Sequence, residues 1–366
     1  MPFRQITGHR RTLALLTGSV ALGSLPPSLI FSGPAGVGKR RAALALAQTL
    51  NCPVPLHDVS MQPVGQGFSP ATGSPEELPH VRRQEALAVD ACGECPSCRR
   101  IQRLVHPDVI LLQPDEDTRN IRVEDVRALT EGLGYRPFEA KWRVVVIDEA
   151  DTLVPFAQNA LLKTLEEPPT SSVFVLVTAR PDALLDTVRS RCPRVRFAPL
   201  TVEQVALVLE REHGVPAVEA RALASVSGGS VGAALDTASV SLAGARAAAE
   251  RLLVRLAAPT DVRARLQVAG EIVGKTAKGG GIGERESLAT HLRVIHAMLR
   301  DIGVLITSGD DRAIANVDLK PALLRLVPAF DRGRLLRGFE AIDRGLEALK
   351  GNASPKIVAD WVVLRI

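Results

Sequence analysis

The chain has 366 residues, 46% of them hydrophobic, and a formal net charge of +5. This length and apolar content predict two or three domains with buried cores and argue against wholesale disorder. The charge is compatible with nucleic-acid contact, but it is smaller than a DNA-reading domain usually carries, and 3% aromatic residues argue against a platform that stacks single-stranded bases.

Targeting and membrane segments are not expected from this sequence. Its N-terminus lacks the long apolar stretch of a secretory signal, and nowhere do about 18 uncharged apolar residues run together. We therefore expect a cytoplasmic protein. Because the cytosol keeps thiols reduced, the four cysteines of its Cys-rich stretch are expected to bind metal rather than to form disulfides.

Residues 1 to about 198 alternate short apolar runs with amphipathic stretches, the pattern of an α/β sheet. The predicted strands are apolar and mostly β-branched, as suits parallel strands covered on both faces. They are Ser28 to Phe31, Val109 to Leu112, Val144 to Ile147 and Val173 to Val177. Between them, a stretch over 53–89 rich in Pro, Gly, Ser and Gln predicts a long surface insertion.

The remaining sequence is predicted to be helical. Pro199 to about Val240 shows the pattern of two or three short helices, and Leu242 to Ile366 is helix-period almost throughout, with a break at Gly279-Gly280-Gly281. This organisation predicts a small helical unit over 199–241 and an all-α domain over 242–366.

A glycine-rich turn follows the first predicted strand. Its sequence, Gly-Pro-Ala-Gly-Val-Gly-Lys, ends at Lys39 and leads into an apolar helix from Ala42 to Leu50, which is the setting of a P-loop. In a P-loop, backbone N–H groups and the helix N-terminus surround phosphate oxygens and the lysine reaches the terminal phosphates. The alternative is a plain turn with an exposed lysine. The expected nucleotide-binding residues here are Gly33, Gly36, Gly38 and Lys39.

One position departs from the P-loop pattern. A loop that hydrolyses nucleotide carries Ser or Thr after the lysine to hold Mg²⁺, and this chain has Arg40 there. A guanidinium cannot ligate a cation. We therefore expect metal-assisted hydrolysis to be weak or absent, whereas ATP binding can survive.

The strand Val144 to Ile147 ends in two acids, Asp148 and Glu149. This is the Walker B arrangement, in which the aspartate orients Mg²⁺ or its water and the glutamate polarises an attacking water. Acids after a strand also commonly cap the next helix. The upstream P-loop favours the Walker B interpretation.

Cys92, Cys95 and Cys98 are separated by two residues each. Turns of that length let thiolates converge on one tetrahedral Zn²⁺, and a structural site needs a fourth ligand. Cys52, just before the insertion, is the first candidate; His57 is the second, and His106 is less favoured. Free buried cysteines are the alternative.

Taken together, these motifs resemble those of the bacterial clamp-loader subunits, which belong to the AAA+ proteins. The resemblance covers nearly all of residues 1 to 240. The densest match runs from Gln158 to Pro169, after the Walker B strand. Within that helix, Phe156, Ala160, Leu161, Thr164 and Leu165 are expected to share one face. Further resemblance lies in His106-Pro107-Asp108, in the segment Ile121 to Arg127, in Ser190-Arg191-Cys192 and in the inserted Cys-rich module.

The resemblance implies roles that the residues alone do not establish. Arg191, preceded by a helix expected from Ala183 to Val188, resembles the arginine finger that each subunit offers to the ATP bound by its neighbour. Thr178 matches the sensor position after the Walker B strand. The segment 199–241 resembles the helical lid, and 242–366 resembles the collar through which five subunits assemble.

Within this family, two positions distinguish the ATP-hydrolysing gamma/tau motor from the delta-prime stator. The motor keeps Thr where this chain has Arg40, and it keeps a sensor arginine where this chain has Gly232. The resemblance therefore favours the delta-prime type, with gamma/tau and delta subunits as partners in a hetero-pentamer that loads the sliding clamp onto primed DNA. The retained Lys39, Asp148 and Glu149 leave the motor type as the alternative.

Two other classes of function are the alternatives. A free-standing P-loop enzyme, such as a nucleotide kinase, would leave the match from Gln158 to Pro169 unexplained. A passive binding module held by its zinc site would need no partner subunits. Only the clamp-loader interpretation requires a stoichiometric hetero-complex.

Overall fold

A computed structural model describes residues 1–58, 88–115, 118–134, 136–238, 242–258, 261–273, 281–307, 314, 316, 319–351 and 353–366. Its contacts divide the chain into two compact units, Met1–Pro199 and Leu200–Ile366. Most of the insertion predicted over 53–89 lies outside the described residues. The further division of the second unit into a lid and a collar stays a prediction.

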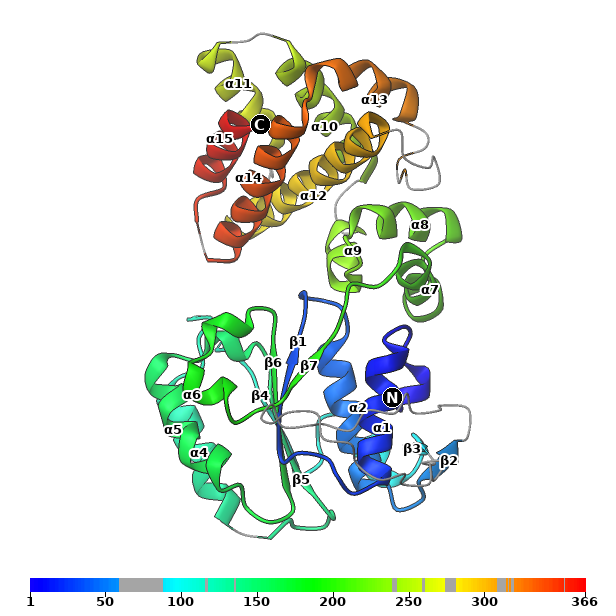
Figure 1. The fold of residues 1–366 in the computed structure, drawn as a ribbon, viewed down its shortest axis with the longest axis vertical. Helices are drawn as coiled ribbons and strands as arrows, with labels where there is room; N and C mark the ends of the chain where they lie inside the picture. The colour runs from blue at the N-terminus through cyan, green and yellow to red at the C-terminus, as the bar shows by residue number, and fades with distance from the viewer. Residues whose placement is uncertain are drawn as a thin grey trace, which may run out of the picture. The chain divides into compact units, whose positions relative to one another are not determined.

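The first unit is built on a five-stranded parallel sheet (Figure 1). Its order is β4 (Val109–Leu112), β5 (Arg143–Ile147), β6 (Ser172–Thr178), β1 (Ser28–Ser32) and β7 (Arg194–Arg196). The four predicted strands are confirmed to within a residue or two. The short edge strand β7 was not predicted, because only Val195 of its three residues is buried and so small an apolar signal indicates no strand.

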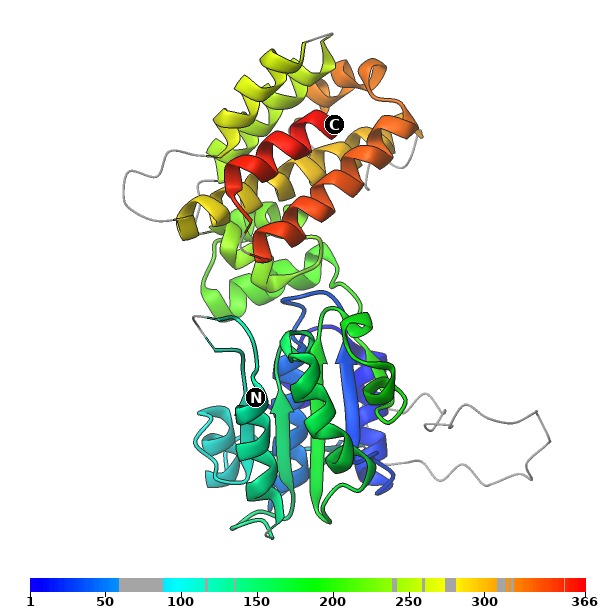
Figure 2. The same ribbon diagram turned by 90° about the vertical axis from the view of Figure 1, so that its left-hand side faces the viewer.

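Helices cover both faces of this sheet (Figures 1 and 2). On one face lie α1 (Arg10–Ala21) and α2 (Lys39–Asn51); on the other lie α4 (Val123–Glu131), α5 (Pro155–Glu166) and α6 (Asp186–Arg189). Two separate apolar cores result, which explains why the central strands are buried on both faces and are apolar at most positions. Short 3₁₀ turns punctuate the unit, namely η1 (Phe3–Gln5), η2 (Gly132–Gly134), η3 (Ala150–Thr152) and η4 (Pro181–Ala183).

Two helix predictions in this unit need correction. The buried face of α5 comprises Ala157, Gln158, Leu161 and Leu165, whereas Phe156 is 77% exposed. Phe156 is in the same first turn as the buried Ala157 and Gln158, but it lies on the side of the helix that faces away from the core. The helix expected from Ala183 to Val188 is instead the turn η4 followed, after Leu184 and Leu185, by the single turn α6.

The Cys-rich stretch forms a small module beside α2. It contains an antiparallel pair, β2 (Leu56–Asp58) and β3 (Ala88–Asp90), and the short helix α3 (Pro96–Gln102). Leu56 pairs with Asp90 and Asp58 with Ala88, so the described residues on either side of 59–87 lie side by side. This pairing brings the chain back toward Cys52 after the insertion.

The second unit is entirely helical in its described residues, as predicted. Leu200 and the helices α7 (Val202–His213), α8 (Ala217–Val226) and α9 (Val231–Ala238) share a small core. A larger core joins α10 (Leu242–Ala257), α11 (Val262–Ile272), α12 (Gly281–Ile306), α13 (Lys320–Leu326), η7 (Val327–Ala329), α14 (Arg332–Lys350) and α15 (Pro355–Arg365). Of the predicted glycine break, Gly281 begins α12 and the other two residues lie outside the described part.

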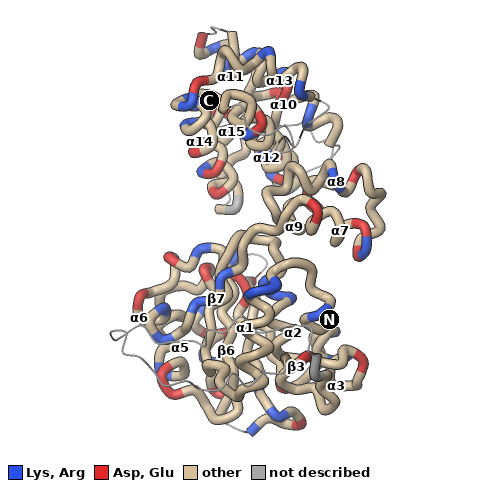
Figure 3. Tube along the Cα trace, turned by 45° about the vertical axis from the view of Figure 1, so that its right-hand side comes forward, with Lys and Arg blue, Asp and Glu red and all other residues tan. Residues whose placement is uncertain are grey.

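Charges of both signs are interspersed over each unit (Figure 3). This distribution agrees with the small net charge of +5. None of the helices in the described residues is long and apolar enough to cross a membrane.

Candidate functional site

Three strands deliver the predicted nucleotide-binding residues to one edge of the sheet. β1 is followed by the P-loop, β5 is followed by Asp148, and β6, which lies between them, ends at Thr178. The register pairs Ser32 with Thr178, and the backbone N–H of Gly33 donates to the Thr178 carbonyl at 3.3 Å. Because parallel strands end at the same edge, residues far apart in sequence meet where α/β proteins bind ligands.

The P-loop backbone requires glycine. Gly33, Gly36 and Gly38 have φ angles of 151°, 72° and 100°, a region that residues with a side chain rarely adopt. At Gly33 an added Cβ would also lie 2.1 Å from the carbonyl oxygen of Phe197. The loop conformation is therefore incompatible with an alanine at this position.

Lys39 opens α2 and is almost fully buried, at 6% exposure. Its Nζ donates to the carbonyl oxygens of Gly33 and Pro34, at 2.6 Å each. The ammonium group thus lies within the loop, where the backbone N–H groups at the start of α2 add positive charge. Anion binding by this loop stays a prediction, and the geometry of Lys39 and the glycines agrees with it.

His9 contacts the P-loop and the residue packed against it. Its Nε2 lies 2.9 Å from the Val37 carbonyl, and its ring packs edge-on against Phe197 with centroids 5.0 Å apart. Burial lowers the pKa of His9, against the opposing effect of the Val37 carbonyl. The neutral ring, donating through Nε2, fits this contact. No sequence motif singled out His9, because its partners lie 28 and 188 residues away.

Arg40 pairs with the Walker B aspartate. One of its guanidinium nitrogens lies 3.3 Å from Asp148 Oδ2. In a hydrolysing P-loop protein, the residue at the Arg40 position and the Walker B aspartate act together through Mg²⁺. Here a side-chain cation stands between the loop and the acid, and it supplies charge without offering a metal any ligand.

The two remaining predicted residues at this edge differ in their surroundings. Glu149 is exposed and adopts a left-handed conformation, with φ at 48°. Thr178 is 1% exposed, and its hydroxyl donates to Asp151 Oδ1 at 2.8 Å. Asp151 also accepts from Arg180 Nε at 2.9 Å. The sequence did not indicate Asp151 or Arg180, although an acid three residues after Asp148 was a signal that could have been used.

Arg191 lies on a surface loop directly after α6. Its guanidinium donates to the Thr187 carbonyl at 2.8 Å and makes an ion pair with Glu166, while 34% of the side chain stays exposed. The following Cys192 is buried against the sheet, and this burial raises the pKa of its thiol to about 12. The buried Cys192 therefore anchors the loop, and Arg191 before it presents a guanidinium at the surface.

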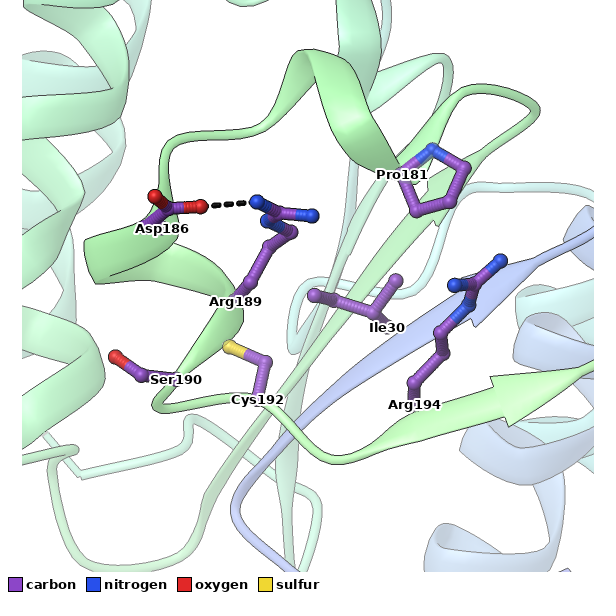
Figure 4. A pocket seen from close by; sticks show the side chains of 7 residues that line it. All are labelled: Ile30, Pro181, Asp186, Arg189, Ser190, Cys192 and Arg194. Carbon is purple, nitrogen blue, oxygen red and sulfur yellow. Dashed lines mark hydrogen bonds and ion pairs between the residues drawn. The ribbon is translucent and has the colours of Figure 1, made fainter.

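A cavity of about 380 Å³ lies beside this loop (Figure 4). Arg189 at its wall pairs with Asp186, and Arg194 donates through Nε to Ser32 Oγ at 2.7 Å. Both guanidinium groups that line the cavity are therefore engaged by neighbouring side chains. The full lining comprises Ile30, Pro181, Asp186, Arg189, Ser190, Cys192 and Arg194.

The four cysteines converge. The sulfurs of Cys52, Cys92, Cys95 and Cys98 all lie within 4.8 Å of one another. Backbone N–H groups point at three of them: Cys92 N lies 3.3 Å from Cys52 Sγ, and equivalent contacts join Cys95 to Cys92 and Cys98 to Cys95. Four thiols at this separation can hold a metal ion, and thiolate ligands suit a tetrahedral site.

His106 and His57 are the other two candidates for the fourth metal ligand. His106 is nearly buried, with Nε2 3.4 Å from Glu139 and Nδ1 accepting from the Asp108 N–H at 3.2 Å. It serves the loop before β4 rather than the cysteine cluster. The side chain of His57 lies outside the described residues.

Comparison with known proteins supports the resemblance. A family described as "DNA polymerase III, delta subunit" matches residues 78–201. DNA polymerase III subunit delta' of Escherichia coli is 39% identical over 152 residues, which cover 42% of this chain and 46% of that protein. Over these matched residues the chain is similar to subunits of DNA polymerase III.

Subunits of both types, tau and delta', are similar to this chain. DNA polymerase III subunit tau of Salmonella typhimurium is 32% identical over 242 residues, covering 65% of this chain and 32% of that protein. DNA polymerase III subunit delta' of Bacillus subtilis is 32% identical over 190 residues, which cover 52% of this chain and 47% of that protein. The chain thus spans less than half the length of each of these relatives.

Solved structures of low sequence identity also match this chain. A DNA polymerase III gamma subunit-related protein from Thermotoga maritima matches with a TM-score of 0.41 and 17% identity, over 96% of this chain and 97% of that one. RuvB from the same organism matches with a TM-score of 0.39 and 15% identity, over 87% and 88%.

Proposed function

We propose that this chain is a delta-prime, stator-type subunit of a DNA polymerase III clamp loader. In this role it completes the ATP site of a neighbouring subunit and does not turn over ATP efficiently itself. Its partners would be gamma/tau and delta subunits, and it would meet the sliding clamp and primed DNA through their assembly. The relatives of both subunit types support membership of such a complex.

The pairing of Arg40 with Asp148 carries the proposal. A hydrolysing site needs a hydroxyl after the lysine and an aspartate free to orient Mg²⁺ or its water. Here the hydroxyl is replaced by a guanidinium that lies 3.3 Å from the aspartate. Repulsion between the guanidinium and Mg²⁺ adds to the loss of a ligand. ATP would bind through the glycine loop and Lys39 and be hydrolysed poorly.

Arg191 would act in trans on the neighbour's ATP. Its guanidinium is partly exposed and is held by Glu166 on its own surface. An exposed ion pair of this kind is worth little, about 0–1 kcal/mol. Arg191 can therefore exchange Glu166 for phosphate oxygens, which a guanidinium contacts through two parallel hydrogen bonds.

The test is the DNA-stimulated ATPase of the reconstituted assembly. Arg191→Ala should lower hydrolysis at the neighbour's site by up to about 10³-fold, as other arginine fingers do. Arg189→Ala is the matched control, because Arg189 lies two residues away and pairs with exposed acids of its own loop. An unchanged ATPase rate in a correctly assembled Arg191→Ala complex would remove this role.

The gamma/tau motor type is the second candidate, favoured by the retained Lys39, Asp148 and Glu149. The isolated chain distinguishes the two. Sustained ATP turnover that Lys39→Ala abolishes would favour the motor type, whereas the stator type predicts little turnover by either protein. Size-exclusion chromatography with partner subunits separates both from a free-standing enzyme.

The metal held by the four cysteines is proposed to be a structural Zn²⁺. Four sulfurs leave no open coordination position, so the ion would organise the module and take no part in chemistry. Metal analysis of protein purified without chelator should give about one equivalent of zinc. A stable, metal-free fold would remove this assignment.

A further inference from the structure

The first four residues of the chain lie across the cysteine module. The Arg4 guanidinium donates to the carbonyl oxygens of Ala91 and Cys92, the latter at 2.8 Å. Pro2 packs against Gly93, where an added Cβ would lie 3.1 Å from the proline ring. The N-terminus therefore contacts the peptide groups on both sides of a predicted metal ligand.

Asp90 fixes the same segment from the other side. Its carboxylate is 2% exposed and accepts hydrogen bonds from the backbone N–H groups of Phe3, Arg4 and Ala91, at 2.8 to 3.0 Å. Arg4 adds an ion pair at 3.3 Å. A buried carboxylate with four donors is a strong constraint, because losing any of them leaves charge unsatisfied in a low-dielectric setting.

These contacts restrict how Cys92 can move. Cys92 is the ligand whose backbone N–H points at Cys52 Sγ and whose own Sγ accepts from Cys95 N. The three cysteines 92, 95 and 98 share one short segment, but Cys52 comes from the end of α2. Joining the two therefore depends on how residues 90–92 are held against the rest of the unit.

We propose that Arg4 and Asp90 are positioning residues for the four-cysteine metal site, holding the backbone before Cys92 so that it faces Cys52. This inference rests on the metal site put forward above and does not depend on the stator role. Groups that orient metal ligands from outside the coordination sphere commonly change affinity by about 10- to 100-fold when they are removed.

Gln48 extends the same arrangement to the P-loop helix. This α2 residue is fully buried, and its side chain donates to the Cys98 carbonyl at 2.7 Å while accepting from the N-terminal amine of Met1 at 2.9 Å. The N-terminus, the cysteine module and α2 are thus joined by hydrogen bonds to one side chain. Metal binding would order all three together.

The experiment measures zinc affinity of the full-length chain by competition with a chromogenic chelator. Arg4→Ala and Asp90→Asn should each weaken zinc binding by about 10- to 100-fold, whereas Arg11→Ala, at an exposed site in α1, should leave it unchanged. The zinc affinity of Arg4→Lys should lie between those of the wild type and Arg4→Ala, because an ammonium group lacks the forked pair of donors that spans two carbonyls. If Arg4→Ala does not fold, Arg4→Lys and Asp90→Asn decide the question.

A second readout separates positioning from general stability. If Arg4 and Asp90 position the ligands, the rise in Tm that zinc produces should shrink in the variants. A purely structural role would lower Tm equally with and without zinc, and that result would overturn the proposal. Unchanged zinc affinity in folded Arg4→Ala and Asp90→Asn proteins would overturn it too. A wild-type chain that binds no zinc would remove the metal site and leave the Arg191 test unaffected.

Discussion

Asp108 shows how one buried carboxylate can organise a loop that precedes a central strand. It is fully buried and accepts from the backbone N–H groups of Phe138, Glu139 and Ala140, at 2.6 to 2.9 Å. Burial by itself would raise the pKa of Asp108, but these three donors outweigh it and hold the pKa below the usual 3.8. The family-like triplet at 106–108 therefore has a structural explanation here.

Asp108→Asn should lower the free energy of unfolding at pH 7 by about 3 kcal/mol, because the amide presents an N–H group to backbone donors. The sign of the pH dependence follows from the lowered pKa. The carboxylate stabilises the fold fully above its unfolded pKa, and this contribution is lost as pH falls through the folded value. The difference in free energy of unfolding between wild type and variant should therefore become smaller in acid. Urea titrations at several pH values would measure it.

The matched control for this prediction is Asp182→Asn. The Asp182 side chain is 85% exposed and makes an ion pair with Arg189 at the surface, so its removal should change stability by less than about 1 kcal/mol. An equal loss of stability in the two variants would contradict the role given to Asp108.

At the scale of elements, helix packing in the second unit depends on close approach. Gly345 of α14 faces α15, where an added Cβ would lie 2.7 Å from Val362 Cγ2 and 3.3 Å from Val358 Cγ1. Both valines are buried and β-branched, so their side chains cannot rotate away freely. Gly345 thus permits the contact between these helices rather than serving as a hinge.

Gly345→Ala should therefore destabilise the protein by about 1–3 kcal/mol through overpacking. Gly270→Ala is the matched control in α11, because no atom lies within 4 Å of its added Cβ. In Gly270→Ala the gain in helix propensity should raise the free energy of unfolding by about 0.5–1 kcal/mol. Opposite signs in chemical denaturation are the expected result, and stabilisation by both changes would show that α15 can move aside.

At the scale of the whole molecule, the two units have separate cores, and only the first contains the cysteine cluster. Apolar clusters fill both faces of the sheet in Met1–Pro199, and other clusters fill the helices of Leu200–Ile366. Units with their own cores unfold as separate cooperative blocks when few contacts join them. Metal binding should then stabilise one block alone.

Calorimetry with and without a zinc chelator tests this expectation. Chelation should lower one of two unfolding transitions by several degrees, since for a unit of this size each kcal/mol lost moves Tm by about 2–4 °C. The other transition should stay in place. A single transition that moves as a whole would indicate that the two units unfold together.

Several features were predictable because their signals are local. The four predicted strands are short, mostly apolar runs, and the glycine loop, the two acids of the Walker B strand and the spacing of Cys92, Cys95 and Cys98 are contiguous patterns. Edge strand β7 and the exposed Phe156 were not anticipated. Both depend on which surface meets the sheet, and a helical or alternating pattern alone does not contain that information.

The sequence by itself therefore determined the α/β and helical regions, the glycine-rich loop and three clustered cysteines, and it named Cys52 as the first candidate for the fourth ligand. Tertiary structure confirmed that Cys52 meets the other cysteines, and it decided the rest: Arg40 lies beside Asp148, which is 108 residues away, and Arg4 reaches the carbonyl of Cys92. The physical reason is that local patterns depend on backbone geometry within a few residues. Pairings across many residues depend on how strands and helices pack, which chain spacing does not specify.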